Sequence, residues 1–165
     1  MTRIIVSLIA LALVAVAPAT AATFRDASVA LARHDYTTAA NIFSLLAERG
    51  DARAQAIMGY LYATGRGVPQ NYIEAARWYR RASEQGDANG QYMLGLAHDK
   101  GHGVPQDYVE AYKWLDLAVA RASGRVRQDW VRIRDAVSSK LSLAQITEAQ
   151  RRALQWRPVY ELPAR

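Results

Sequence analysis

The sequence predicts an all-α protein, a short right-handed α-α superhelical solenoid of about four helical hairpins. The first observation is a repeat: GRGVPQNYIEAARWY at residues 65–79 returns as GHGVPQDYVEAYKWL at residues 101–115, with nine of fifteen positions identical at an offset of 36 residues. The second is a set of apolar residues at steps of three and four, which is the helical period. The third is the placement of glycine and proline where such helices would end. Together these patterns predict two-helix units that stack on one another.

Residues 1–21 have the pattern of a signal peptide. Arg3 is followed by the apolar run Ile4–Ala17 and by the small-x-small sequence Ala19-Thr20-Ala21. The run is shorter than the ~18 to 20 residues that span a bilayer, so we expect no stable membrane span after cleavage. The absence of cysteine suits an exported protein that is held together by packing alone. We therefore expect an exported protein, in the periplasm or secreted.

Residues 22–50 are expected to form an N-terminal helical hairpin, a partial repeat that caps the stack. A short helix near residues 27–33 would be followed by a second helix over residues 36–49. Shifting the repeat back by 36 places Tyr36 on Tyr72 and Phe43 on Tyr79, which supports this assignment.

The two full repeats are expected over residues 51–86 and 87–122. In each, Asp51 or Asp87 precedes the first helix as an N-cap. Gly59 and Gly95 lie in mid-helix, where glycine costs about 1 kcal/mol relative to alanine. We expect that glycine occurs here because its lack of a side chain leaves room for an aromatic ring of the second helix, Trp78 or Trp114.

The recurring loop is predicted to end one helix and begin the next. Its glycines permit a left-handed turn, and Pro69 and Pro105 prevent the helix from continuing. Asn71 and Asp107 follow as N-caps, with Glu74 and Glu110 three residues later, a capping-box arrangement. The second helices then carry an apolar stripe of aromatic residues and alanines. The stripe comprises Tyr72, Ala75, Trp78, Tyr79 and Ala82, with Tyr108, Ala111, Trp114, Leu115 and Ala118 in the next repeat.

Residues 123–165 are expected to supply C-terminal capping helices and a tail. One helix is predicted over residues 124–140. Ser142 and Gln145 form a capping box that opens another helix, which ends near Trp156 and before Pro158.

These repeats resemble the Sel1-like repeats, relatives of the tetratricopeptide repeats with a longer loop inside each hairpin. The second copy departs from that pattern at two positions. His98 stands where the first copy has the aromatic Tyr62, and Ala122 stands where the first copy has its closing glycine, Gly86. The resemblance implies a scaffold or adaptor for protein–protein interaction, with no enzymatic activity and no cofactor. It also implies that a protein or peptide partner lies along a concave face made by the first helices. Position by position, that face comprises Arg53, Ala56, Tyr60, Thr64, Asn89, Tyr92, Leu96 and Lys100.

An envelope enzyme acting on peptidoglycan or a β-lactam is one alternative. The sequence offers it little support, because it has no cysteine, no Gly-x-Ser-x-Gly elbow and no Ser-x-x-Lys arrangement. His98 and His102 have the i, i+4 spacing of a helical metal motif, but Gly101 between them is the predicted helix stop. We therefore expect no metal site, and we expect no nucleic-acid partner.

Docking to an anionic surface is the other alternative. The net charge of +6 is concentrated in residues 121–165, which hold ten basic and four acidic side chains. Such a segment can bind lipid head groups or another anionic polymer, or it can be a solvated helical face.

Overall fold

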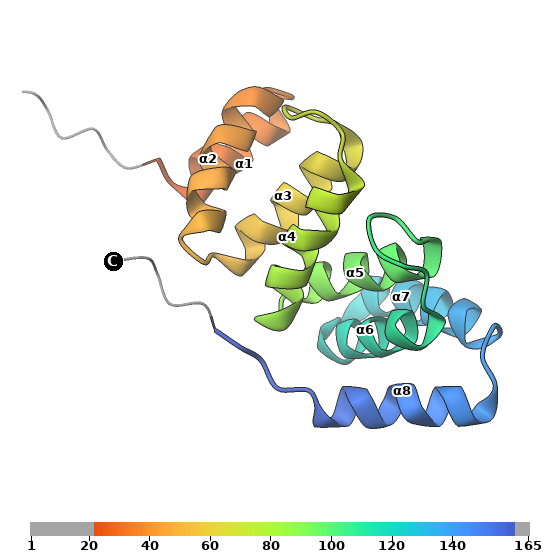
Figure 1. The fold of residues 1–165 in the computed structure, drawn as a ribbon. Coiled ribbons are helices and arrows are strands. Elements are labelled where there is room, and N and C mark those ends of the chain that lie inside the picture. The colour runs from red at the N-terminus through yellow and green to blue at the C-terminus, as the bar shows by residue number, and fades with distance from the viewer. Residues whose placement is uncertain (1–21, 161–165) are drawn as a thin grey trace, which may run out of the picture.

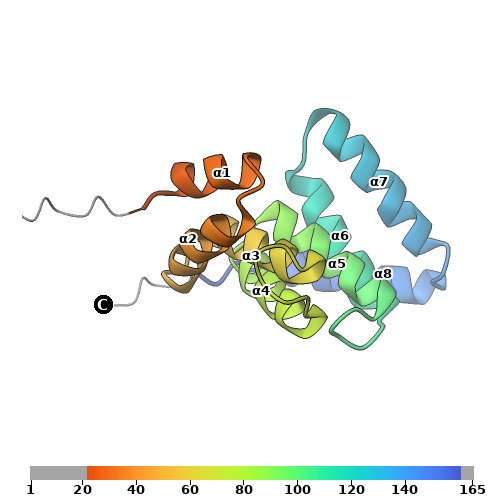
Figure 2. The same cartoon turned by 90° about the horizontal axis from the view of Figure 1, so that it is seen from above.

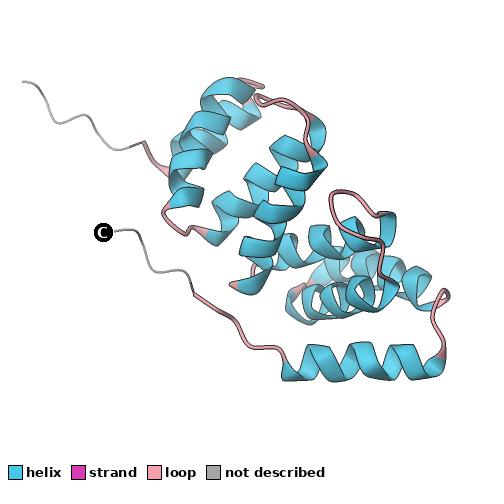
Figure 3. Cartoon of the chain, viewed as in Figure 1, coloured by secondary structure: helices cyan, strands magenta, loops and turns pink. Residues whose placement is uncertain are grey.

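The structure, a computed structural model, describes residues 22–160, and this part of the chain folds into eight α-helices without a β-strand (Figures 1 and 3). The predicted signal peptide at residues 1–21 and the last five residues of the tail lie outside the described range. The predicted all-α helical-repeat fold is confirmed. The helices are α1 (Phe24–Ala32), α2 (Tyr36–Glu48), α3 (Ala52–Thr64), α4 (Tyr72–Glu84), α5 (Ala88–Lys100), α6 (Tyr108–Arg121), α7 (Gly124–Ser138) and α8 (Leu143–Gln155).

Side-chain caps fix where most of these helices begin. Asp51 and Asn71 accept hydrogen bonds from backbone N–H groups of the first turn, as their positions before α3 and α4 predict. The predicted capping boxes at Glu74 and Glu110 are wrong, because neither carboxylate bonds back to the N-cap backbone and both form ion pairs instead. Glu74 pairs with Arg77 at 2.9 Å, and Glu110 pairs with Lys113 at 3.0 Å.

Three helical hairpins stack in chain order: α1–α2, α3–α4 and α5–α6 (Figure 1). The last two helices differ from the expected fourth hairpin, because each packs mainly on α6. The apolar cluster around Leu115 of α6 includes Val137 from α7 and Ala149 from α8. A single helix of the last repeat is therefore covered from two sides, which closes the stack.

Both repeat tryptophans are buried between hairpins, as predicted. Trp78 packs in a cluster with Phe43 of α2, and Trp114 packs with Ala75 of α4 and Ala153 of α8. Their exposed fractions are 8% and 3%.

The expectation that these tryptophans fill the space beside the mid-helix glycines is wrong. A Cβ at Gly59 would overlap the ring of Tyr79, and a Cβ at Gly95 would lie 2.7 Å from the Cγ of Leu115. Tyr79 and Leu115, each the residue after a tryptophan, therefore face the first helix of their own hairpin. The tryptophan itself points to the neighbouring hairpin.

The loop of each repeat packs on the start of the preceding second helix. Gly67 and Gly103 have φ of 73° and 74°, and a Cβ on either would overlap a backbone carbonyl, that of Tyr36 or of Tyr72. Arg66 lies over the Tyr36 ring at 5.2 Å, and His102 stacks on Tyr72 at 4.6 Å. The loop therefore holds adjacent repeats in register.

Candidate binding groove

The first helices of the three hairpins, α1, α3 and α5, contribute to one side of the stack. In Figure 2, α1 and α7 rise at opposite ends, and α3 and α5 lie between them. Two cavities open along α3 and α5, and both are lined by Tyr60 and Met93. The two cavities are therefore adjacent, and we refer to them together as the groove.

The first part of the groove, which we call the groove cavity, lies among α1, α3 and the start of α5. Its volume is about 310 Å³. Its lining residues are Phe24, Leu31, Arg53, Ala56, Ile57, Tyr60, Asp87, Asn89 and Met93.

The second part, which we call the inter-repeat pocket, lies between the α3–α4 hairpin and α5. Its volume is about 280 Å³, and most of its wall is apolar. Its lining residues are Tyr60, Ala63, Thr64, Tyr72, Ala75, Ala76, Tyr79, Met93, Leu96, Ala97, Lys100 and His102.

Seven of the eight residues predicted to form the binding face line the groove. Arg53, Ala56 and Asn89 line the groove cavity; Thr64, Leu96 and Lys100 line the inter-repeat pocket; and Tyr60 lines both. Their role in binding a partner stays a prediction.

Tyr92 is the predicted residue that lies elsewhere. Its ring stacks on Trp130 of α7, with ring centroids 4.7 Å apart and planes 9° from parallel. Burial is the main reason that the pKa of the Tyr92 hydroxyl is raised. Since α7 falls outside the 36-residue repeat, no repeat pattern indicates that it covers this position.

The sequence interpretation missed Phe24, Met93, Ala97 and His102 as groove residues. Phe24 was detectable, because it lies 36 residues before Tyr60 and occupies the same place in the partial N-terminal repeat. Met93 and Ala97 follow from the helical period, since each lies one turn from a predicted residue on α5. His102 could not be found this way, because its place depends on how the loop folds back.

Charged side chains border the groove at both ends. Arg53 lies over the ring of Phe24 at 4.4 Å, with Asp51 3.8 Å away. At the other end, Lys100 pairs with Asp99 at 3.1 Å, and Lys140 binds the same carboxylate. Burial raises the pKa of Asp99, but the hydrogen bonds from Lys140 and Lys100 outweigh it and hold the pKa below its usual value. Asp99 is thus ionised and shared by two cations.

Arg66 of the recurring loop contacts two aromatic residues. Its guanidinium donates to the hydroxyl of Tyr60 and lies over the ring of Tyr36. Alanine at this position is therefore expected to have a larger effect than a solvated loop residue would.

His98 is buried and has a structural role. It takes the place of Tyr62 of the first repeat, and its Nδ1 lies 3.3 Å from the carbonyl oxygen of Pro105. Its Nε2 is buried without a hydrogen-bond partner in the part of the chain that the structure describes. His102 points instead to Tyr72, so the two imidazoles do not share a helix face.

Acid is expected to destabilise the protein through His98. Burial lowers the pKa of its imidazole, despite the opposing Pro105 hydrogen bond. The imidazole therefore binds a proton more tightly in the unfolded chain than in the folded one. The contribution of neutral His98 to the free energy of unfolding is fully present above about pH 6.5 and is lost as the pH drops below that value. In urea titrations at pH 7.5 and 5.5, wild type should lose more unfolding free energy than His98→Phe. Equal losses in the two proteins would contradict this role.

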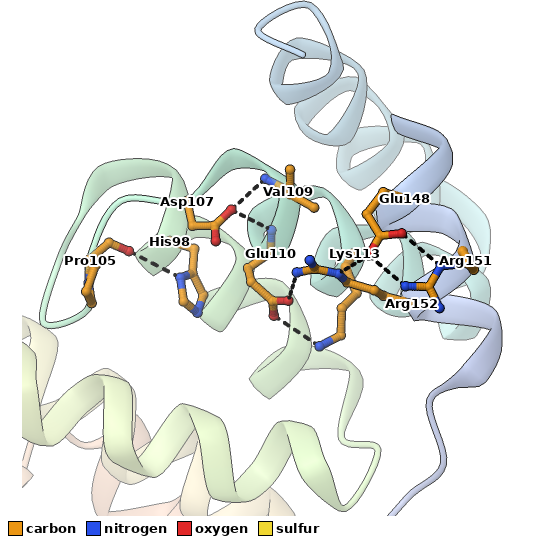
Figure 4. A network of polar contacts seen from close by, with 9 residues as sticks. All are labelled: His98, Pro105, Asp107, Val109, Glu110, Lys113, Glu148, Arg151 and Arg152. Carbon is orange, nitrogen blue, oxygen red and sulfur yellow. Dashed lines mark hydrogen bonds and ion pairs between the residues drawn. The ribbon is translucent and has the colours of Figure 1, made fainter. Parts of the chain in front are cut away.

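The C-terminal helix is attached to the last repeat by a polar network (Figure 4). Arg152 reaches Glu110 of α6 at 2.9 Å and Glu148 of its own helix at 2.7 Å. Hydrogen bonds from Arg151 and Arg152 lower the pKa of Glu148 to about 2. The network places α8 against α6 and, through it, the tail beside α4, where the N–H of Val159 donates to the Glu84 carbonyl at 2.7 Å.

Many basic side chains of the C-terminal third have acidic partners within the protein. Arg134 pairs with Asp116 and Asp135, and Arg132 pairs with Asp129. Three of the basic residues, Arg134, Lys140 and Arg152, pair with acidic residues of α6 or α5, and these pairs help to hold α7 and α8 in place. These pairs give part of the basic charge a structural role.

Two features bear on other activities. Residues 22–160 contain no group of three or more His, Cys, Asp or Glu side chains placed to hold a metal ion. Within the same range, no helix has both the length and the apolar character needed to cross a bilayer.

The stacked hairpins and their groove define a protein of the α-helical repeat class. The family model of the Sel1 repeat matches residues 52–87 and 88–123. The two matched segments make up 72 of the 165 residues, so less than half of the chain is similar to the Sel1 repeat. Proteins with this repeat generally mediate protein–protein interactions.

Two solved structures are similar to this chain. One is a protective antigen of uropathogenic Escherichia coli with an SLR fold, at 27% identity and a TM-score of 0.73; the match covers 80% of this chain and 28% of that one. The other is a Sel1 repeat protein from Oxalobacter formigenes, at 26% identity and a TM-score of 0.64, covering 82% of this chain and 56% of that one. This chain thus spans less than two thirds of either relative. No curated protein sequence matches it.

Proposed function

We propose that this protein is an exported adaptor that binds an extended segment of a partner protein along the groove. The observation that carries the proposal is that seven predicted face residues line two adjacent cavities. Apolar walls with a few polar groups at their edges are typical of sites that bind peptide side chains and main chain. The repeat family, whose members bind other proteins, supports the same assignment.

The periplasmic location rests on the sequence of residues 1–21 and the absence of cysteine. Cell fractionation followed by mass measurement tests it directly. The expected product is a periplasmic protein that begins at Ala22. A protein of full-length mass in the cytoplasm would contradict the proposal.

Photo-crosslinking in native cells tests the adaptor role. A crosslinking residue at Asn89, which is exposed beside the groove cavity, should capture one defined protein partner. The same residue at Leu45, 58% exposed on α2 and away from the groove, should not. Replacing both Arg53 and Tyr60 by alanine should remove the captured product, because the pair borders the groove cavity. Capture that is equal at the two positions, or unchanged in the double variant, would reject the groove as the binding surface.

A further inference from the structure

The inter-repeat pocket lies at a contact that occurs twice in the stack. The same contact exists one repeat earlier, where the α1–α2 hairpin meets α3. The hairpin side of the two contacts is nearly the same in composition. Phe24, Ala27, Ser28, Tyr36, Ala39, Ala40 and Phe43 in the earlier contact correspond, at an offset of 36, to Tyr60, Ala63, Thr64, Tyr72, Ala75, Ala76 and Tyr79 in the later one.

The opposing side differs, and each of three differences removes volume. Leu96 stands where the first repeat has Tyr60, Ala97 where it has Leu61, and His102 where it has Arg66. Equal walls facing smaller side chains leave space between them. At these three positions the second repeat thus lines the pocket with smaller side chains than the first repeat has.

The first contact shows what the larger residues do there. Leu61 is fully buried, with 0% exposure, within the core shared by the first two hairpins. Arg66 crosses the ring of Tyr36 and donates to the hydroxyl of Tyr60. In the second contact, His102 stacks on Tyr72, the equivalent of Tyr36, and forms part of the pocket wall.

The charge at the mouth of the pocket is positive. None of its described lining residues is acidic, whereas Lys100 and His102 contribute a cation and an imidazole. Lys100 replaces Thr64 of the first repeat, and its side chain is 59% exposed. Asp99 carries one negative charge, which it shares between Lys100 and Lys140, so a net positive charge remains beside the pocket.

We propose that the inter-repeat pocket binds one aromatic or large aliphatic side chain of a peptide, and that Lys100 at its mouth pairs with an acidic residue adjacent to that side chain in the peptide. A volume of about 280 Å³ suits one such anchor residue. The adjoining groove cavity, with Arg53 and Asn89, offers polar groups to the neighbouring main chain, which favours a peptide over a small amphiphile. This inference rests on the proposed function and specifies the chemistry of the partner.

Selection from a phage-displayed library of random short peptides tests the proposal and does not require an identified partner. Enriched sequences should share an aromatic or large aliphatic residue next to Asp or Glu. Synthetic versions, labelled for fluorescence anisotropy, give the dissociation constants. Changing the acidic residue of a peptide to Lys should weaken binding to wild type and strengthen binding to Lys100→Glu, because the attraction changes sign.

Pocket-filling variants supply the matched comparison. Ala97→Leu and Leu96→Tyr introduce the residues of the first repeat, so each side chain is already accepted by an equivalent wall in this fold. Each should weaken peptide binding by about 30-fold or more, since a buried anchor then has no space. Leu45→Tyr on the exposed face of α2 should leave binding unchanged. His102→Arg serves as a third variant if thermal unfolding shows that one of the others has not folded.

Three outcomes would overturn the proposal. Peptides that bind the filled variants as tightly as wild type, but fail to bind Arg53→Ala, would exclude the pocket and leave the proposed function standing. Decanoate binding as tightly as the peptides and lost in the filled variants would assign the pocket to a small amphiphile. Failure to enrich any peptide would reject this inference, while the adaptor role would still be decided by crosslinking at Asn89.

Discussion

Replacement of Trp114 by alanine is expected to lower the free energy of unfolding by about 3–5 kcal/mol. The indole is 3% exposed and packs among residues of α4, α5 and α8, with the ring of Trp156 edge-on at a centroid distance of 6.4 Å. Removing it leaves a cavity at the point where the α3–α4 hairpin, the α5–α6 hairpin and the C-terminal helix α8 meet. Urea unfolding followed by circular dichroism measures the loss.

Leu154→Ala is the control for this experiment. Leu154 is 78% exposed on α8, so its truncation should change the free energy of unfolding by less than about 0.5 kcal/mol. Similar small losses for Trp114→Ala and Leu154→Ala would mean that the hairpins do not stack around Trp114 as described.

Replacement of Gly103 by alanine is expected to lower the free energy of unfolding by roughly 2–5 kcal/mol. Two costs add. The residue has φ of 74°, which an L side chain tolerates poorly, and its Cβ would overlap the carbonyl group of Tyr72 and lie 2.8 Å from the N of Ile73. Because those atoms belong to the backbone of the preceding repeat, they have no rotamer by which to move away. Thermal and urea unfolding of the purified variant test the prediction.

Gly101→Ala separates the two costs. Gly101 has nearly the same φ, 71°, but the nearest atom to an added Cβ is the Cβ of Gln106 at 3.5 Å, an ordinary contact. This variant should therefore lose only the roughly 1–2 kcal/mol of a left-handed residue. If Gly101→Ala and Gly103→Ala lose the same amount, the loop does not press on the preceding repeat.

Much of the fold was predictable because local signals and the repeat agree. Asp51, Asn71 and their equivalents begin helices, the glycine and proline residues of the loop end them, and the offset of 36 fixes which helices pair. Where a prediction depended on the direction of one side chain, it was less secure. Gly59 faces Tyr79 and not Trp78, because the two neighbours point to different helices. Glu110 does not form the predicted capping box and pairs instead with Lys113 and Arg152. Arg152 lies on α8, far along the chain.

The candidate site divides in the same way. Seven face residues were predictable, since the first helices repeat the same face at a constant offset. Tyr92 was not, because Trp130 belongs to α7, which the repeat does not include. The role of Arg66 was also not predictable, since its contact with Tyr36 needs the loop to fold back on the preceding repeat.

The sequence by itself determined the helices, their order and the pairing of helices within each repeat, because these depend on neighbours a few residues away or on a period that is visible in one chain. Only the tertiary structure decided that α7 and α8 close on α6, that Lys140 and Lys100 share Asp99, and that a pocket opens beside Leu96, Ala97 and His102. The physical reason is that empty space and shared charge are properties of surfaces brought together by folding. Whether small residues leave a pocket depends on the size of the side chains opposite them on the neighbouring hairpin.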